Sequence, residues 1–182
     1  MRIVAGEFRS RILKTLPGDN TRPTTDRLRE AMFSRLGPYF EGGRVLDLFA
    51  GSGAIALEAL SRGFDEAVLV DSSREACRIV RENIASLQVQ ARSRVYQSDY
   101  KTALEKLEGQ FDLIFLDPPY AFDRMEELIR TIGEKDLLKD DGVLAVETNA
   151  RTELSPIEPF YIEKDAVYGI SRITYMRKEK SQ

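Results

Sequence analysis

Short apolar runs alternate with segments of helical periodicity from residue 45 to residue 147, and this alternation limits the fold more than any other feature. Strands that are apolar along their whole length and separated by helices form a mostly parallel sheet with helices on both faces. The expected strands are Val45–Phe49, Ala67–Asp71, Arg94–Gln97, Phe111–Asp117 and Val143–Glu147. The expected helices are Ala54–Arg62, Arg74–Leu87, Lys101–Leu107 and Met125–Ile132.

The two ends of the chain do not follow this alternation. Residues 1–16 are apolar and basic, and we expect them to form a small hairpin. After a turn, Thr25 or Asp26 is expected to cap a helix, since both side chains accept hydrogen bonds from the first turn. Beyond residue 150, Phe160–Lys164 and Val167–Arg177 are expected to be two antiparallel strands. The sequence therefore predicts an N-terminal extension over residues 1–25 and one domain over residues 26–182.

Composition excludes several classes of protein. The 182 residues contain no histidine and a single cysteine, Cys77, which rules out an internal disulfide and makes a transition-metal site or a histidine-dependent nucleophile improbable. We therefore expect no metal. No apolar run approaches the roughly 18–20 residues of a membrane helix, and the N-terminus lacks a secretory signal, so a cytoplasmic protein is expected.

Charge is distributed unevenly along the chain. Residues 1–36 hold eight basic and four acidic side chains, a net charge of +4, which leaves −7 for the remainder of a chain whose total is −3. A basic segment on an acidic body is typical of a polyanion-binding patch. A solvated arginine-rich helix face is the other explanation.

Four of the expected strands end in or next to an acid. In an open parallel sheet, ligands bind beyond the carboxyl ends of the strands. One crevice is therefore expected to be lined by Asp47 to Gly53 (with Phe49, Ala50 and Ser52), Asp71–Ser72, Ser98–Tyr100 and Asp117–Tyr120.

The glycine loop after the first strand narrows the choice of cofactor. Gly51, Gly53 and Ala56 fit the G-x-G-x-x-G/A pattern of dinucleotide sites. Asp47, four residues before Gly51, would instead repel a pyrophosphate at short range. It suits a cofactor with cationic groups and no phosphate, which favours S-adenosylmethionine over NAD.

The next two acids have less specific roles. Asp71 can accept both ribose hydroxyls of either cofactor. Asp99 is placed to accept an adenine amino group, with Tyr100 near the ring. Each of these acids precedes a helix and could serve only as its N-cap.

The stretch Asp117-Pro118-Pro119-Tyr120 ends the fourth strand with a stiff turn. Each proline fixes its own φ and restricts the residue before it, so the turn is rigid before any ligand binds. The Asp117 carboxylate and the Pro118 carbonyl could accept the two hydrogens of an exocyclic amino group on a nucleobase. Tyr120 could stack on that base, and Phe122 could extend the same wall.

Together these motifs resemble a known family. D-x-F-A-G-S-G followed by D-P-P-Y resembles the S-adenosylmethionine-dependent amino-group methyltransferases. The opening MRIVAGEFRSR…RPTTDRLREAMFSRL, the block VLDLFAGSGAIALEALSRG and the late VYGISRITY resemble the bacterial RsmD family of 16S rRNA guanine-N2 methyltransferases, from Met1 to about Met176. Ser10 departs from the family, where glycine is expected.

The resemblance implies a fold, a reaction and a set of site residues. The fold would be an α/β Rossmann-like sheet of seven strands with an N-terminal hairpin. Asp117, Pro118, Pro119 and Tyr120 would hold the target guanine, and the glycine loop with Asp71, Ser72, Asp99 and Tyr100 would hold S-adenosylmethionine. The partner would be 16S rRNA in the small ribosomal subunit or an assembly intermediate. RNA contacts would come from Arg9, Arg11, Lys14, Arg22 and Phe122.

Three other functions remain open from the sequence. A DNA adenine-N6 methyltransferase would use the same chemistry, but the chain lacks room for a separate target-recognition domain. A non-catalytic ribosome-assembly factor would not need an intact glycine loop and DPPY turn. An NAD enzyme would bind NADH and not S-adenosylmethionine.

Overall fold

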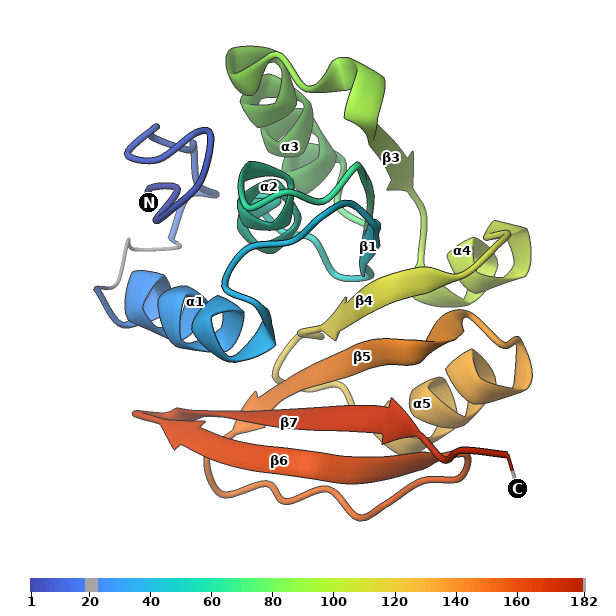
Figure 1. Ribbon diagram of the computed structural model, residues 1–182. Helices are drawn as coiled ribbons and strands as arrows, with labels where there is room; N and C mark the ends of the chain where they lie inside the picture. Colours follow the sequence, from blue (N-terminus) through green and yellow to red (C-terminus); the bar gives the residue numbers. More distant parts are fainter. Residues whose placement is uncertain (19–22, 182) are drawn as a thin grey trace.

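The computed structural model describes residues 1–18 and 23–181, and its centre is one seven-stranded sheet (Figure 1). The strand order is β3-β2-β1-β4-β5-β7-β6. β1 to β5 run parallel, and β7 pairs antiparallel with both β5 and β6. The strands are β1 (Arg44–Asp47), β2 (Glu66–Asp71), β3 (Ser93–Gln97), β4 (Phe111–Leu116), β5 (Leu138–Asn149), β6 (Phe160–Tyr168) and β7 (Ser171–Lys178).

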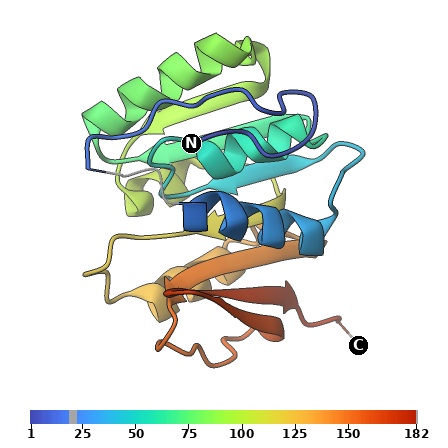
Figure 2. The same cartoon turned by 90° about the vertical axis from the view of Figure 1, so that its left-hand side faces the viewer.

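Helices cover both faces of the sheet (Figure 1), and Figure 2 looks onto the face that residues 1–18 also cover. They are α1 (Pro23–Leu36), α2 (Ala54–Ser61), α3 (Arg74–Leu87), α4 (Tyr100–Lys106) and α5 (Met125–Glu134), with a short 3-10 turn at Gln90–Arg92. Alternate residues of the central strands β1, β2, β4 and β5 enter two separate cores, so Val45 packs with α1, α2 and α3 while Leu46 packs with α4 and α5. None of the helices in residues 1–18 and 23–181 is long and apolar enough to cross a membrane.

The predicted alternation of strands and helices is confirmed, and the main errors concern where elements begin and end. β5 starts at Leu138, five residues before the predicted strand. The final strands are antiparallel as predicted, but the prediction placed their connection too early. β6 continues to Tyr168, and the turn lies at Gly169–Ile170, where Gly169 takes φ 62°. A register shift between Ile162 and Lys164 and three consecutive exposed charged residues, Glu163 to Asp165, interrupt the alternation, which hid the second half of the strand.

The N-terminal segment forms a looser structure than the predicted hairpin. Arg2 and Ile12 form a single antiparallel bridge, and Ile3 and Leu13 are buried in the core that α1, α2 and α3 share. The prediction that Thr25 or Asp26 caps the next helix is wrong, because α1 begins at Pro23 and both residues lie in its first turn. Proline suits that first position because it has no N–H to satisfy.

A buried carboxylate fastens this segment to the domain. Glu58 on α2 is fully buried and accepts hydrogen bonds from the backbone N–H groups of Val4 and Ala5, at 2.8 and 3.1 Å. The same carboxylate binds the guanidinium groups of Arg29 and Arg62, each at 3.0 Å. Four donors from three parts of the chain therefore converge on one side chain, which satisfies a charge that would otherwise be costly to bury.

Candidate active site

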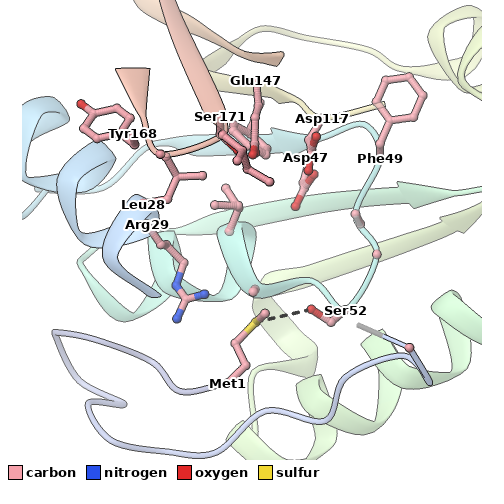
Figure 3. A pocket seen from close by; sticks show the side chains of 18 residues that line it. Met1, Leu28, Arg29, Asp47, Phe49, Ser52, Asp117, Glu147, Tyr168 and Ser171 are labelled. Atoms are coloured by element: carbon pink, nitrogen blue, oxygen red, sulfur yellow. Dashed lines mark hydrogen bonds between the residues drawn. The ribbon is translucent and has the colours of Figure 1, made fainter. Parts of the chain in front are cut away.

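A cavity of about 510 Å³ opens at the carboxyl ends of β1, β4 and β5. Asp47 ends β1, Asp117 comes directly after β4, and Glu147 lies near the end of β5. Figure 3 shows these three carboxyl groups side by side along the wall of the cavity, opposite Met1 and Ser52. The glycine loop and the turn before β7 complete the wall. The cavity therefore joins the two regions that the sequence predicted to be functional, the glycine loop and the acid-proline turn.

Asp47 is a buried acid that the protein itself does not fully satisfy. It is 1% exposed, and its Oδ1 has no hydrogen-bond partner among the described residues. Burial raises its pKa to about 7, the nearby charge of Asp71 adds to the shift, and hydrogen bonds from the backbone of Phe49 and Ala56 oppose it. An unsatisfied carboxylate oxygen at a cavity wall is a ready acceptor for a cationic ligand group.

The glycine loop depends on backbone conformations that other residues rarely adopt. Gly51 has φ 57°, and its N–H donates to Oδ2 of Asp71 at 2.9 Å. Gly53 has φ 83°, and a Cβ there would lie 3.0 Å from Leu69. A Cβ added at Gly51 would meet nothing within 4 Å, so the loop keeps open space on that side.

Asp71 also fixes the start of α3. Its Oδ1 accepts the backbone N–H of Ser73 at 2.9 Å, while Ser73 caps the helix by accepting from Ala76. Asp71 thus ties the glycine loop to the end of β2 and remains partly exposed. Neither Asp71 nor the exposed Ser72 lines the cavity itself, and both lie farther along the rim.

The third strand end contributes a helix cap and an aromatic cluster. Asp99 caps α4 through the N–H and hydroxyl of Thr102, at 2.9 and 2.8 Å, and these bonds lower its pKa. Tyr100 packs against Phe49 and Phe122, with ring centroids 5.7 and 5.2 Å away. Phe122, expected at the RNA surface, is partly buried in this cluster beside two residues expected to bind the cofactor.

The acid-proline turn projects from the sheet at the cavity mouth. Asp117 lines the cavity, whereas Pro119 and Tyr120 are exposed and do not, and Tyr120 is 93% exposed. Tyr120 therefore presents a nearly free ring to solvent beside the opening. An aromatic ring so placed can stack on a base that approaches from outside.

Glu147 belongs to this site and was not singled out from the sequence. Leu116 lies opposite Val146 where β4 pairs with β5, so the residues that follow them, Asp117 and Glu147, are neighbours. Burial raises the pKa of Glu147, while hydrogen bonds with the Ser171 hydroxyl and the Asp117 carboxyl oppose the shift. The signal that could have revealed it is the one used for the other acids, a carboxylate at the carboxyl end of a parallel strand.

The basic residues of the N-terminal segment have different surroundings. Arg9 is exposed, Arg11 donates to the backbone carbonyl of Ser86 at 2.7 Å, and Lys14 pairs with Glu82 at 2.9 Å. Arg11 and Lys14 thus hold the segment on α3 while staying accessible from outside. Arg22, the fourth predicted RNA contact in this region, lies outside the described residues.

The acids that line the cavity fit S-adenosylmethionine better than a phosphate-bearing cofactor. The unpartnered oxygen of Asp47 can accept a hydrogen bond from an ammonium group, and Asp117 and Glu147 disfavour a phosphate beside them. No group of three His, Cys, Asp or Glu side chains in residues 1–18 and 23–181 is arranged to hold a metal ion.

Comparison with known proteins agrees over nearly the whole chain. The family model described as "Conserved hypothetical protein 95" matches residues 1–177. The "Putative rRNA methyltransferase YlbH" of Bacillus subtilis (strain 168) is 38% identical, over 98% of this chain and 99% of its own. The Ribosomal RNA small subunit methyltransferase D of Haemophilus influenzae is 32% identical, over 93% and 90% of the two chains. A solved structure from Thermus thermophilus is 31% identical, covers 97% of this chain and 99% of its own, and superposes with a TM-score of 0.83.

Proposed function

The chain belongs to the family of Ribosomal RNA small subunit methyltransferase D, and from this premise we propose that it methylates the N2 amino group of a guanine in 16S rRNA. The methyl donor is S-adenosylmethionine. One observation carries the proposal: Asp117, Asp47 and the glycine loop line a single cavity. A methyl group held at the loop would face an amino group held at the turn.

Residues of the first three strand ends would hold the cofactor. Asp47 accepts the ammonium group, the open side of Gly51 allows close approach of the ligand, and Asp71 accepts ribose hydroxyls. Asp99 and Tyr100 lie farther along the rim, where the adenine would bind. When bound, S-adenosylmethionine would supply an electrophilic methyl carbon, and the electron pair of its carbon–sulfur bond would stay on sulfur.

Residues of the acid-proline turn would prepare the nucleophile. The N2 lone pair of guanine is delocalised into the ring, so the free amino group is a weak nucleophile. Asp117 and the carbonyl of Pro118 accept its two hydrogens, which orients the lone pair toward the methyl donor. Asp117 then accepts the proton that the nitrogen loses. Tyr120 stacks on the base after it leaves its own stack.

The N-terminal extension, residues 1–25, would supply RNA affinity to the catalytic domain of residues 26–182. Exposed Arg9, and the outward parts of Arg11 and Lys14, are placed for phosphate contacts that carry no sequence information. The substrate is the small ribosomal subunit or an assembly intermediate, which places the reaction in the bacterial cytoplasm.

A labelled methyl-transfer assay tests the proposal. Small subunits from a strain that lacks the enzyme are compared with duplex DNA under identical salt. We expect label in 16S rRNA alone, and none with Asp117→Ala. Label in DNA alone would indicate an adenine methyltransferase, and full transfer by Asp117→Ala would remove the catalytic role. Absence of any transfer, with binding to the subunit retained, would indicate an assembly factor.

A further inference from the structure

We propose that Glu147 selects guanine by accepting the N1–H of the base whose N2 amino group is held at Asp117. The inference deepens the proposed function and depends on it. It assigns to Glu147 a contact with the Watson–Crick edge of the substrate base. The acid-proline turn alone does not explain why that base is guanine.

The sheet places the two acceptors next to each other. β4 and β5 are parallel neighbours, and the register that sets Leu116 opposite Val146 brings Asp117 and Glu147 to adjacent positions on one cavity wall (Figure 3). The side chain of Asp117 also lowers the pKa of Glu147, which shows that the two carboxyl groups interact. Two neighbouring donors of one base edge can therefore reach both residues.

Guanine is the common base whose edge matches two adjacent acceptors. Its N1 carries a hydrogen next to the N2 amino group, so it presents donors side by side. In adenine and cytosine, the ring nitrogen next to the amino group is an acceptor, which an ionised carboxylate repels. A base with an acceptor at N1 would leave the Glu147 carboxylate without a hydrogen-bond donor. The free-energy cost of that unpaired acceptor discriminates strongly against such a base.

The surroundings of Glu147 favour the binding of a ligand that donates a hydrogen bond to it. Asp47 and Asp117 line the same cavity, while the guanidinium of Arg29 at its far side binds Asp26 through Nη2 and Glu58 through Nε. The Ser171 hydroxyl is the donor that β7 offers to Glu147. Two carboxyl groups in contact need a proton or an external donor between them, and the guanine edge supplies such donors.

The test compares guanosine with 2-aminopurine at the methylated position. The position is first mapped with the wild-type enzyme, and subunits are then reconstituted with 2-aminopurine there. This base keeps the N2 amino group but has an acceptor at N1. We expect the wild type to prefer guanine. Glu147→Gln can donate to an N1 acceptor, so we expect it to reduce the preference by about 10- to 100-fold.

Two further variants control the comparison. Glu147→Asp keeps the charge and should retain the preference for guanine. Glu126→Gln changes an exposed glutamate on α5 and should leave both rates unchanged. Cofactor binding, measured by calorimetry, should be equal in all variants.

Each result has one meaning. A Glu147→Gln enzyme that keeps the wild-type preference, or loses both rates by the same factor, overturns the role of Glu147 and leaves the proposed function intact. A wild type that transfers no methyl group to guanine in the subunit overturns both. A reduced preference with unchanged cofactor binding supports the inference.

Discussion

Asp71 holds the glycine loop through Gly51, whose backbone N–H lies 2.9 Å from Oδ2 of the carboxylate. The same side chain accepts the N–H of Ser73, so one residue fixes both the loop and the start of α3. The loop geometry that the proposed cofactor needs is thus set by the neighbouring strand and not by the glycines alone.

Removing this carboxylate should weaken cofactor binding. Asp71→Ala loses both backbone contacts, and at about 1.5–3 kcal/mol for a hydrogen bond to a charged group we expect the Kd for S-adenosylmethionine to rise at least tenfold. Asp71→Asn keeps one acceptor and should show a smaller loss. Calorimetric titration measures both, and an unchanged Kd for Asp71→Ala would refute the dependence of the loop on Asp71.

The raised pKa of Asp47 predicts a pH dependence of stability. The carboxyl titrates at about 7 in the folded protein and at 3.8 in the reference state, so the folded state binds more protons between these values. Stability should therefore fall as pH rises from about 4 to 7, by up to about 1.4 kcal/mol per pH unit from this group, and level off above 7. Asp47→Asn should unfold at higher urea than the wild type at pH 8, with the difference shrinking toward pH 4.

The titration of Asp47 predicts the opposite pH trend for the affinity of the cofactor. An ammonium ligand binds the ionised form, so the affinity of the wild type for S-adenosylmethionine should rise with pH up to about 7. Titrations at pH 5.5 and 8 measure this trend. Equal affinities at both pH values in the wild type would contradict the assignment of Asp47, and Asp47→Asn should show no such trend.

Glu58 should be critical for stability although it lies outside the cavity. Its removal leaves Arg29 and Arg62 as buried charges and frees the N–H groups of Val4 and Ala5. We expect Glu58→Ala to lose about 3–5 kcal/mol in urea unfolding and to expose residues 1–18 to protease. Glu126→Ala, which breaks an exposed pair with Arg130, should lose well under about 1 kcal/mol. Equal losses in the two variants would show that the buried contacts of Glu58 stabilise the fold no more than an exposed ion pair does.

Tyr120 should act on the RNA step alone. Its ring is 93% exposed, so Tyr120→Ala should leave stability and cofactor affinity unchanged. Loss of one stacked base, at about 1–3 kcal/mol, should lower kcat/KM for subunits by about 5- to 150-fold, while Tyr120→Phe keeps the ring and the rate. Identical rates for the alanine variant and the wild type would exclude stacking on Tyr120.

Local sequence patterns predicted the fold better than they predicted the details of the site. Apolar runs and helical periodicity located the strands of the parallel core because burial on both faces leaves a clear pattern, as in Phe111–Leu116. The glycine loop and the acid-proline turn were found because each needs particular residues at fixed spacing. Asp71 and Asp99 were expected as ligand contacts, and in the structure both bind backbone groups, a role that a single sequence does not distinguish.

Long-range contacts explain what the sequence patterns did not reveal. Glu147 joins the site only because β5 lies next to β4, and the chain between Asp117 and Glu147 includes the whole of α5. Phe122 looked like a surface residue because its position in the chain does not show that Phe49 and Tyr100 lie beside it. The buried pairing of Arg29 with Glu58 was also invisible, since arginine is most often exposed.

The most direct test of the central claim is mass mapping of rRNA nucleosides from a strain without the gene, complemented with wild type or with Asp117→Ala. If Asp117 and the glycine loop form one methyl-transfer site, the deletion should lose one N2-methylguanosine from 16S rRNA, and only the wild type should restore it. An unchanged set of 16S methylguanosines in the deletion strain, or full restoration by Asp117→Ala, would contradict the account.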